Sequence, residues 1–194
     1  YLASQLADAP DNVNTALRAL RKRVMLRLIV RDLTGAADLT EVMHTITTLA
    51  EVAVETALRH LDTALRAAWG TPIGEESGAA QNLIVVAMGK LGGGELNVSS
   101  DIDLIYVYPE DGHTDHATPR SNHEYFSRLG QKLSAALSEM TAEGYVFRVD
   151  LRLRPYGESG PLVSSFAMLE QYFITQGREW ERYAWIKARA LSGD

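Results

Sequence analysis

Residues 1–80 carry apolar side chains at helical spacing. These side chains recur every three or four positions over residues 10–33 and again over residues 39–69, which predicts two amphipathic helices. Asp38 and Glu41 form a capping box at the start of the second helix, because both can satisfy backbone N–H groups that have no partner inside the helix. We therefore expect a helical N-terminal region.

A glycine-containing loop over residues 70–80 separates these helices from a stretch with the pattern of strands. Residues 83–88 are a short apolar run rich in β-branched side chains, and a glycine-rich turn leads to a similar run over residues 99–108. In residues 145–155 apolar and polar side chains alternate, so an extended chain would present on its polar face Arg148, Asp150, Arg152 and Arg154. The sequence therefore predicts three strands.

Further helices are expected between and after these strands. A second capping box and helical spacing predict a helix over residues 121–143, with Met140 on its buried face. The polar residues 109–119 before it are expected to form a loop. The C-terminal part predicts two more helices, over residues 166–172 and 179–191.

These elements indicate an α+β fold. The helical region over residues 1–80 precedes a second unit over residues 81–194, built on a small mixed sheet with flanking helices. A chain of 194 residues that is 46% hydrophobic can bury one substantial core. Because the first residue is Tyr1 and not Met, we expect a fragment of a longer protein.

Charge and composition narrow the class of protein. The net charge of −6 argues against binding of nucleic acid through a basic surface. No apolar run is long enough to span a membrane, so no membrane partner is expected. The absence of cysteine excludes disulfides and thiolate metal sites and is typical of cytoplasmic proteins.

Three aspartates are the candidate catalytic residues. Asp101 and Asp103 alternate at the start of a strand, so their side chains share one face, about 6–7 Å apart at the backbone. Asp150 lies among arginines on another strand. Such acids are often only a solvated turn or an ion pair, but a buried strand does not begin with paired acids unless a cation offsets them. Three carboxylates on neighbouring strands suit two Mg²⁺ ions of a phosphoryl-transfer site.

The spacing of these residues resembles a known superfamily. Gly89 and Lys90, then ten residues, then Asp101 and Asp103, with Asp150 later on a strand, are similar to the signature of polymerase-β-type nucleotidyltransferases. The resemblance implies that fold and a metal-dependent nucleotidyl transfer. The usual Gly-Ser or Gly-Gly pair is Gly-Lys here, so its phosphate-binding role falls to Lys90 or to the amides of residues 92–94.

Longer segments resemble a more specific family. GKLGGGELNVSSDIDLI, RVDLRLRPYGESGPLV and GREWERYAWIKARALSGD closely resemble the bifunctional enzymes that add AMP to a tyrosine of glutamine synthetase and remove it. The sequence RLRP followed by an aromatic residue and GESG is typical of the half that removes AMP. The resemblance implies phosphorolysis, in which orthophosphate attacks adenylylated glutamine synthetase and ADP leaves. Two alternatives remain: the ATP-using adenylylating half, and a regulatory nucleotide-binding module without catalysis.

The same resemblance supplies candidate binding residues. Glycines at positions 157 and 160 bracket a turn whose amides suit an anion, beside two arginines that suit phosphate. Part of the KAR segment is implied to face the nucleotide. The candidates for phosphate and nucleotide binding are Gly89, Lys90, Gly92, Gly93, Ser100, Arg152, Arg154, Glu158, Ser159, Lys187 and Arg189.

A protein partner is also implied. The intact enzymes of this family respond to the PII signal protein, and a basic stripe of Arg23, Arg27 and Arg31 on the first helix is the candidate contact. Such a stripe is more commonly a solvated helix face. We carry both interpretations forward.

Overall fold

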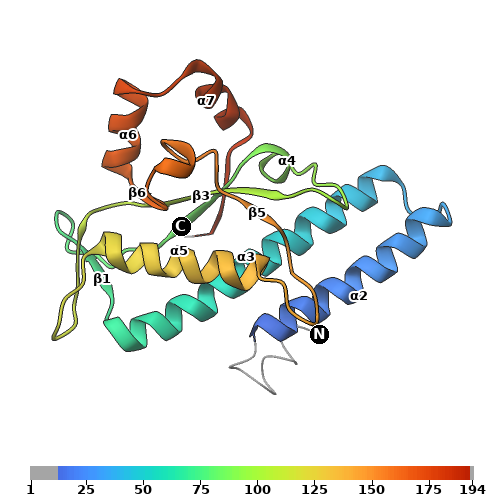
Figure 1. Ribbon diagram of the computed structural model, residues 1–194, viewed down its shortest axis with the longest axis horizontal. Coiled ribbons are helices and arrows are strands. Elements are labelled where there is room, and N and C mark those ends of the chain that lie inside the picture. Colours follow the sequence, from blue (N-terminus) through green and yellow to red (C-terminus); the bar gives the residue numbers. More distant parts are fainter. Residues whose placement is uncertain (1–12, 193–194) are drawn as a thin grey trace.

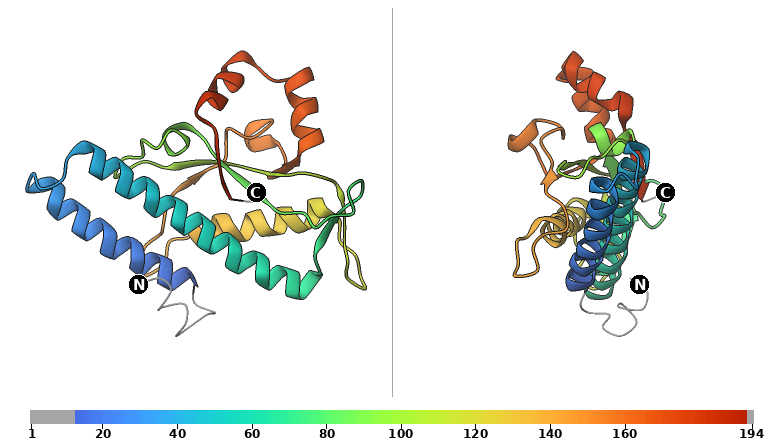
Figure 2. Two further views of the ribbon diagram at one scale, coloured as in Figure 1. Left: turned by 180° about the vertical axis from the view of Figure 1, so that it is seen from behind. Right: turned by 90° about the vertical axis from the view of Figure 1, so that its right-hand side faces the viewer.

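The structure, a computed structural model, describes residues 13–192 and consists of a mixed sheet with helices on both faces (Figure 1). Helices α2 (Val13–Leu33) and α3 (Leu39–Trp69) form the N-terminal region and lie side by side (Figure 2). Both helices were predicted, although the expected start of the first at residue 10 lies outside the described residues.

Local chemistry fixes the ends of α3. The side chain of Asp38 accepts a hydrogen bond from the amide of Glu41 at 2.7 Å, which is half of the predicted capping box. The helix ends at Gly70, whose φ of 80° lies in the left-handed region that glycine adopts without strain. Helix α5 (Asn122–Ser138) begins in the same way, at the side chain of Ser121.

The central sheet has the strand order β5-β3-β2-β7, and β6 also pairs with β3. β3 runs antiparallel to β2 but parallel to both β5 and β6, which pair with opposite ends of β3. This arrangement confirms the predicted mixed sheet with flanking helices. The strands are β2 (Ile84–Ala87), β3 (Ile102–Tyr108), β5 (Val149–Asp150), β6 (Val163–Ser165) and β7 (Arg189–Ser192).

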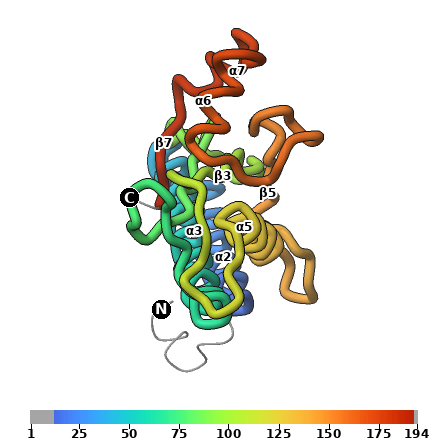
Figure 3. Tube along the Cα trace, turned by 90° about the vertical axis from the view of Figure 1, so that its left-hand side faces the viewer, coloured from blue at the N-terminus to red at the C-terminus, as the bar shows by residue number. Residues whose placement is uncertain are grey.

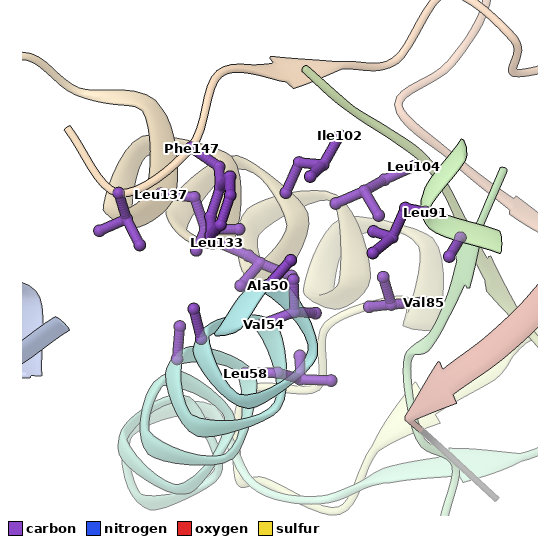
Figure 4. Packing of buried hydrophobic residues seen from close by; sticks show 14 of the residues in the cluster. Ala50, Val54, Leu58, Val85, Leu91, Ile102, Leu104, Leu133, Leu137 and Phe147 are labelled. Carbon is purple, nitrogen blue, oxygen red and sulfur yellow. The ribbon is translucent and has the colours of Figure 1, made fainter. Parts of the chain in front are cut away.

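The two faces of this sheet pack against different helices. On one face Val85, Leu104 and Tyr106 join a core shared with α2, α3 and α5. Figure 4 shows part of this core, with Ala50 and Val54 of α3 beside Leu133 of α5. Because this core runs from Val13 to Val163, the N-terminal helices and the sheet share one apolar interior.

The other face carries the C-terminal helices. Val86, Ile105 and Val107 pack there against Leu169 and Trp185. Leu169 belongs to α6 (Phe166–Thr175), and Trp185 follows α7 (Glu179–Ala184). Figure 3 shows α6 and α7 on the opposite side of β3 from α3 and α5. The alternation of side chains along β2 and β3 thus sorts the molecule into two layers of helices.

The predicted strand over residues 145–155 is wrong in its length. Only Val149 and Asp150 are paired, because the carboxylate of Asp150 accepts a hydrogen bond from the amide of Arg152 at 2.8 Å and turns the chain. The amide of Gly157 then donates to the carbonyl of Arg154 at 2.9 Å. Alternation alone did not reveal this competing local bond.

The predicted helix over residues 179–191 is also wrong in its second half. Helix α7 stops at Ala184, and residues 189–192 form β7 along the free edge of β2. Pairing with β2 supplies hydrogen-bond partners that an edge strand otherwise lacks.

Two predicted loops contain short strands. β1 (Pro72–Gly74) and β4 (Gly112–Thr114) pair antiparallel, which sequence periodicity could not indicate over three residues. The predicted helix over residues 121–143 ends at Ser138, so Met140 is exposed and not buried as expected. Within residues 13–192 no helix is both long and apolar enough to cross a membrane.

Candidate active site

The three candidate aspartates lie together where β3 begins. β3 and β5 are parallel and in register, so Asp103 lies directly opposite Asp150. Asp101 immediately precedes β3 and is exposed, whereas Asp103 and Asp150 are half-buried. Asp103 alternates with Leu104 and so shares the face of Ile105, which packs toward α6 and α7. The structure therefore brings the three acids to one end of the sheet, on the α6–α7 side.

These acids line a pocket of about 500 Å³, which we call the aspartate pocket. Its size is within the range of sites for small molecules. Three acidic and three basic side chains line it. The lining residues are Gly89, Lys90, Asn97, Ser99, Ser100, Asp101, Asp103, Arg148, Asp150 and Arg152.

Two arginines bind two of the acids. The Nε atom of Arg148 donates to Asp101, and its terminal nitrogen donates to the carbonyl of Ser99 at 2.8 Å. The Nε atom of Arg152 donates to the two oxygens of Asp150 at 3.0 and 2.9 Å. Both guanidinium groups are largely exposed. Each can leave its acid without exposing apolar surface.

The electrostatics differ between neighbouring acids. Burial, followed by the charges of Asp150 and Asp101, raises the pKa of the Asp103 carboxyl above its ordinary value. The hydrogen bonds from Arg152 lower the pKa of the Asp150 carboxyl. Asp103 is therefore the acid whose negative charge is least compensated in this pocket.

The donor set suits a hard divalent cation. With side chains as they stand, no group of three or more acidic or histidine side chains in residues 13–192 converges on one metal position, since Arg148 and Arg152 hold Asp101 and Asp150. The three carboxylates nevertheless line one pocket, with Asp103 directly opposite Asp150. Carboxylate oxygens are the ligands that Mg²⁺ takes from proteins. The pocket thus offers the type of ligand that Mg²⁺ takes, and binding of the ion stays a prediction that requires Asp101 and Asp150 to leave their arginines.

The start of the glycine-rich segment lies against this site. Gly89 starts α4 (Gly89–Gly92) with a φ of 53°, and a Cβ atom there would lie 2.8 Å from the carboxylate of Asp103. Glycine at position 89 thus permits both the turn and the close approach to the acid. Lys90 and Ser100 line the pocket beside it.

The amides of residues 92–94 are already used inside the protein. The amide of Gly92 donates to Met88, that of Gly93 to Gly89, and that of Gly94 to Leu91. Of the two alternatives for the phosphate-binding role, this arrangement favours Lys90, whose side chain is exposed in the pocket. A Cβ atom on Gly92 would lie 1.9 Å from the carbonyl oxygen of Lys187, so this glycine serves packing.

Other candidates lie outside the lining of the aspartate pocket. Arg154 donates to the carbonyl of Leu151 at 2.9 Å and to the carbonyl of Glu158 at 3.2 Å, and so holds its own turn. The amides of Gly157 and Gly160 donate within the turn and are not available to an anion, so an anion site at this turn stays a prediction. Ser159 lines a separate, neighbouring pocket.

Lys187 and Arg189 are engaged with acids outside the aspartate pocket. The Nζ atom of Lys187 lies 2.6 Å from Glu95, and Arg189 binds Glu51 of α3. Arg189 also donates to the carbonyls at the end of α4. Neither side chain lines the aspartate pocket, and their implied contact with nucleotide stays a prediction.

The basic stripe on α2 is partly engaged as well. Arg31 forms two hydrogen bonds to Glu41 of α3, at 2.8 and 2.9 Å. Arg23 and Arg27 lie on the same helix and are exposed. The contact with the PII protein stays a prediction.

Sequence reasoning did not select three lining residues. Arg148 was noted only as part of an alternating face, and Asn97 and Ser99 were not considered. Closeness in sequence to the aspartates could have marked them, because they lie two to four residues before Asp101 or two residues before Asp150. Neutralisation of one acid by Arg148 depends on strand pairing and has no sequence signature.

Comparisons with known proteins extend these observations. The family described as "Glutamate-ammonia ligase adenylyltransferase" matches residues 1–194. The chain belongs to this family. It is 62% identical over 187 residues to the bifunctional glutamine synthetase adenylyltransferase/adenylyl-removing enzyme of Chromobacterium violaceum, which covers 96% of this chain and 21% of that protein.

Other relatives carry the same name. The protein of Nitrosomonas europaea is 60% identical over 193 residues, or 98% of this chain and 21% of the relative. That of Aromatoleum aromaticum is 56% identical over 194 residues, or 100% of this chain and 20% of the relative. The chain thus spans about one fifth of the length of these members of the glutamate-ammonia ligase adenylyltransferase family.

Proposed function

We propose that this chain removes AMP from the adenylylated tyrosine of glutamine synthetase by phosphorolysis. The observation that carries the proposal is the register of β3 and β5, which sets Asp103 opposite Asp150 and beside Asp101. The relatives' name includes an adenylyl-removing activity. The RLRPYGESG segment resembles the half of such enzymes that removes AMP, which favours removal over addition.

The reaction balances without a covalent intermediate. An oxygen of orthophosphate attacks the phosphorus of the AMP group, and the bond from that phosphorus to the tyrosine oxygen breaks. The new phosphorus–oxygen bond makes ADP. The proton of hydrogen phosphate passes to the tyrosine oxygen, so free tyrosine is restored. In-line transfer of this kind depends on positioning and on compensation of charge.

Negative charge is the main obstacle, because a phosphate dianion must approach a phosphodiester beside three carboxylates. Mg²⁺ held by Asp101, Asp103 and Asp150 would supply Lewis-acid stabilisation of the transferred group. Release of Arg148 and Arg152 from their acids places two guanidinium groups in the pocket. Arg152 suits orthophosphate through its fork of N–H donors, and Lys90 suits it as a point charge.

Arg152 is a better candidate than Arg154 for the phosphate contact. Arg152 lines the pocket and is bound only within its own turn and to Asp150, whereas Arg154 is held by two backbone carbonyls. Arg152→Ala should weaken the binding of orthophosphate, so that more orthophosphate is needed to reach the same rate. Arg152→Lys should keep only part of this binding, because a bidentate donor becomes a single charge.

The test is the identity of the nucleotide product. The chain is incubated with AMP-modified glutamine synthetase, Mg²⁺ and orthophosphate, and the nucleotides are separated. ADP formed in step with loss of AMP from the protein is the expected result. Free AMP would show hydrolysis instead. Modification of unmodified glutamine synthetase in the presence of ATP would assign the chain to the adenylylating half.

Matched variants check that the three acids hold the ion. Asp101→Asn and Asp103→Asn each remove a ligand charge with little change in volume, so turnover should fall at least a hundredfold while the fold is kept. Glu95→Gln is the control, since Glu95 binds Lys187 away from the pocket. Binding of Mn²⁺, followed by electron paramagnetic resonance, supplies a readout other than turnover. Full activity of both variants would contradict the assignment.

A further inference from the structure

A second pocket lies beside the aspartate pocket and is not used by the proposed reaction. It has a volume of about 360 Å³, and we call it the Tyr156 pocket. Arg152 lines both pockets, so they meet at that side chain. The Tyr156 pocket lies between the turn after β5 and the helices α6 and α7, on the face of the sheet toward which Asp103 points.

The lining combines flat rings with polar groups. Tyr156 and Trp180 are each about half exposed, at 56% and 53%, and so offer ring surface to a ligand. Ser159 and Gln176 supply a hydroxyl and an amide that can both donate and accept hydrogen bonds. A ring that carries donors and acceptors on its edge suits this lining better than a purely apolar ring.

The charge of the pocket favours an anion. Arg152 and Arg178 both line it. The one carboxylate in the lining, Glu181, is already engaged, since it accepts from the hydroxyl of Tyr172 at 2.6 Å and from the amide of Arg178 at 2.7 Å. With Arg152 released from Asp150, as the proposed reaction requires, two arginines outnumber this one carboxylate, so the lining has a net positive charge.

Tyr156 is held in an unusual backbone conformation. Its φ of 62° makes it the one non-glycine residue with positive φ in the part of the chain that the structure describes. A left-handed conformation is strained for a residue that carries a side chain. The ring packs edge-on against Tyr172, with centroids 4.6 Å apart, and this contact places it at the pocket wall. Glycine would adopt this backbone conformation without strain. The presence of tyrosine at this position therefore indicates that its ring has a role, such as contact with a ligand.

We propose that the Tyr156 pocket binds the nucleoside part of the nucleotide whose phosphate lies at the aspartates. The base stacks on Tyr156 and Trp180, Gln176 or Ser159 contacts its edge, and Arg152 lies at the junction near the phosphate. This inference rests on the proposed function. It places the nucleoside away from Lys187 and Arg189, which bind Glu95 and Glu51 and line neither pocket.

The experiment compares two probes that differ only in the base. AMP and ribose 5-phosphate are titrated into the chain in the presence of Mg²⁺, and affinity is measured by calorimetry. Stacking of a base on an aromatic side chain contributes about 1–3 kcal/mol, which corresponds to roughly fivefold to a hundredfold in affinity. AMP should therefore bind at least tenfold more tightly than ribose 5-phosphate.

Two variants locate the base. Trp180→Ala and Tyr156→Gly should each weaken AMP roughly tenfold and leave ribose 5-phosphate unchanged. Tyr156→Gly relieves the backbone strain, so a loss of binding cannot be ascribed to a strained fold. Tyr183→Ala is the matched control, because Tyr183 lies on the same helix, is 74% exposed and does not line the pocket. AMP should also change the fluorescence of Trp180, and Trp180→Ala should remove that change.

Equal affinity for the two probes would overturn the proposal, as would variants that weaken both probes alike. A tyrosine-containing peptide of glutamine synthetase that binds through Trp180, with AMP unaffected by the variants, would assign the pocket to the protein substrate instead. These outcomes are independent of whether ADP or AMP is the reaction product. Failure of the base site and failure of phosphorolysis are therefore distinguishable.

Discussion

At the scale of single residues, Asp103 and Asp150 should affect stability in opposite directions. The raised pKa of Asp103 means that its charge opposes folding above that pKa, so Asp103→Asn should raise the melting temperature at pH 7. The gain should disappear as the pH falls through the pKa of Asp103, where the carboxyl of the unmodified chain becomes neutral. Thermal melts with EDTA at pH 7 and pH 4 measure this.

Asp150→Asn should have the opposite effect on stability. Its lowered pKa means that the charged carboxyl stabilises the fold above its ordinary value of about 3.9 and loses this effect as the pH falls. Asp150→Asn should therefore lower the melting temperature at pH 7 and have little effect in strong acid. A stabilising Asp150→Asn would show that the pair with Arg152 does not form in solution.

The sequence could predict which acids lie together, but not which partners the basic candidate residues have. Alternation along a strand sets Asp101 and Asp103 on one face, and the motif spacing selects Asp150. Lys187 and Arg189 pair with acids far away in the sequence, Glu95 and Glu51. Those contacts follow from tertiary packing, which local patterns do not contain.

At the scale of elements, the N-terminal helices are tied to α5 by a buried arginine. Arg18 is 3% exposed and donates to the carbonyls of Ala136 and Glu139 at the end of α5, at 3.3 and 2.6 Å, and to that of Gly144 at 2.8 Å. The sequence pattern did not mark this residue, because an arginine on a helix is normally taken as exposed.

Replacement of Arg18 tests this tie. Arg18→Leu leaves several carbonyls without a partner and should cost about 3 kcal/mol of the free energy of unfolding. Lys22→Ala on the same helix removes only an exposed ion pair, with Nζ 3.8 Å from Glu143, and should cost less than about 0.5 kcal/mol. Urea denaturation of both variants measures the difference. Equal costs would contradict the role of Arg18.

The junction of α4 with the chain before β7 supplies another test. A Cβ atom at Gly92 would meet the backbone oxygens of Lys187 and Ala87 at 1.9 and 2.7 Å, so Gly92→Ala should destabilise by about 3 kcal/mol. At Gly93 the nearest atom, 3.1 Å away, belongs to the flexible side chain of Lys187, and φ is −76°. Gly93→Ala should therefore be tolerated. Denaturation midpoints decide between the two outcomes.

Elements with long periodic patterns were predicted well, and short ones were not. α2, α3 and α5 follow from apolar stripes and caps. β1, β4 and β7 have only three or four residues and exist because another segment offers a free edge. β5 is shortened by the bond from the amide of Arg152 to Asp150, a local contact that overrides a clean alternation.

At the scale of the whole molecule, the residues on the two sides of the boundary predicted at residue 80 share one hydrophobic core. The core that includes α2 and α3 also includes β3 and α5. A shortened chain that begins at residue 81 would expose the apolar faces of α5 and the sheet. It should be insoluble or lack a cooperative transition, whereas the chain of 194 residues should unfold in one step. A folded, cooperative short chain, seen by calorimetry, would contradict a shared core.

β5 and β6 pair with the two ends of the same strand, β3. Residues 151–162 therefore leave and rejoin a single rigid support, and the positions of both ends are fixed by hydrogen bonds of the sheet. The part of this segment that follows Arg154 can change in length without moving Asp103 relative to Asp150, because paired strands hold both acids and the cost of closing a longer loop grows slowly with its length. The fold thus holds the acids and Arg152 apart from the later residues of the turn that line the Tyr156 pocket, so a change in those residues would alter the proposed base site and leave the acids in place.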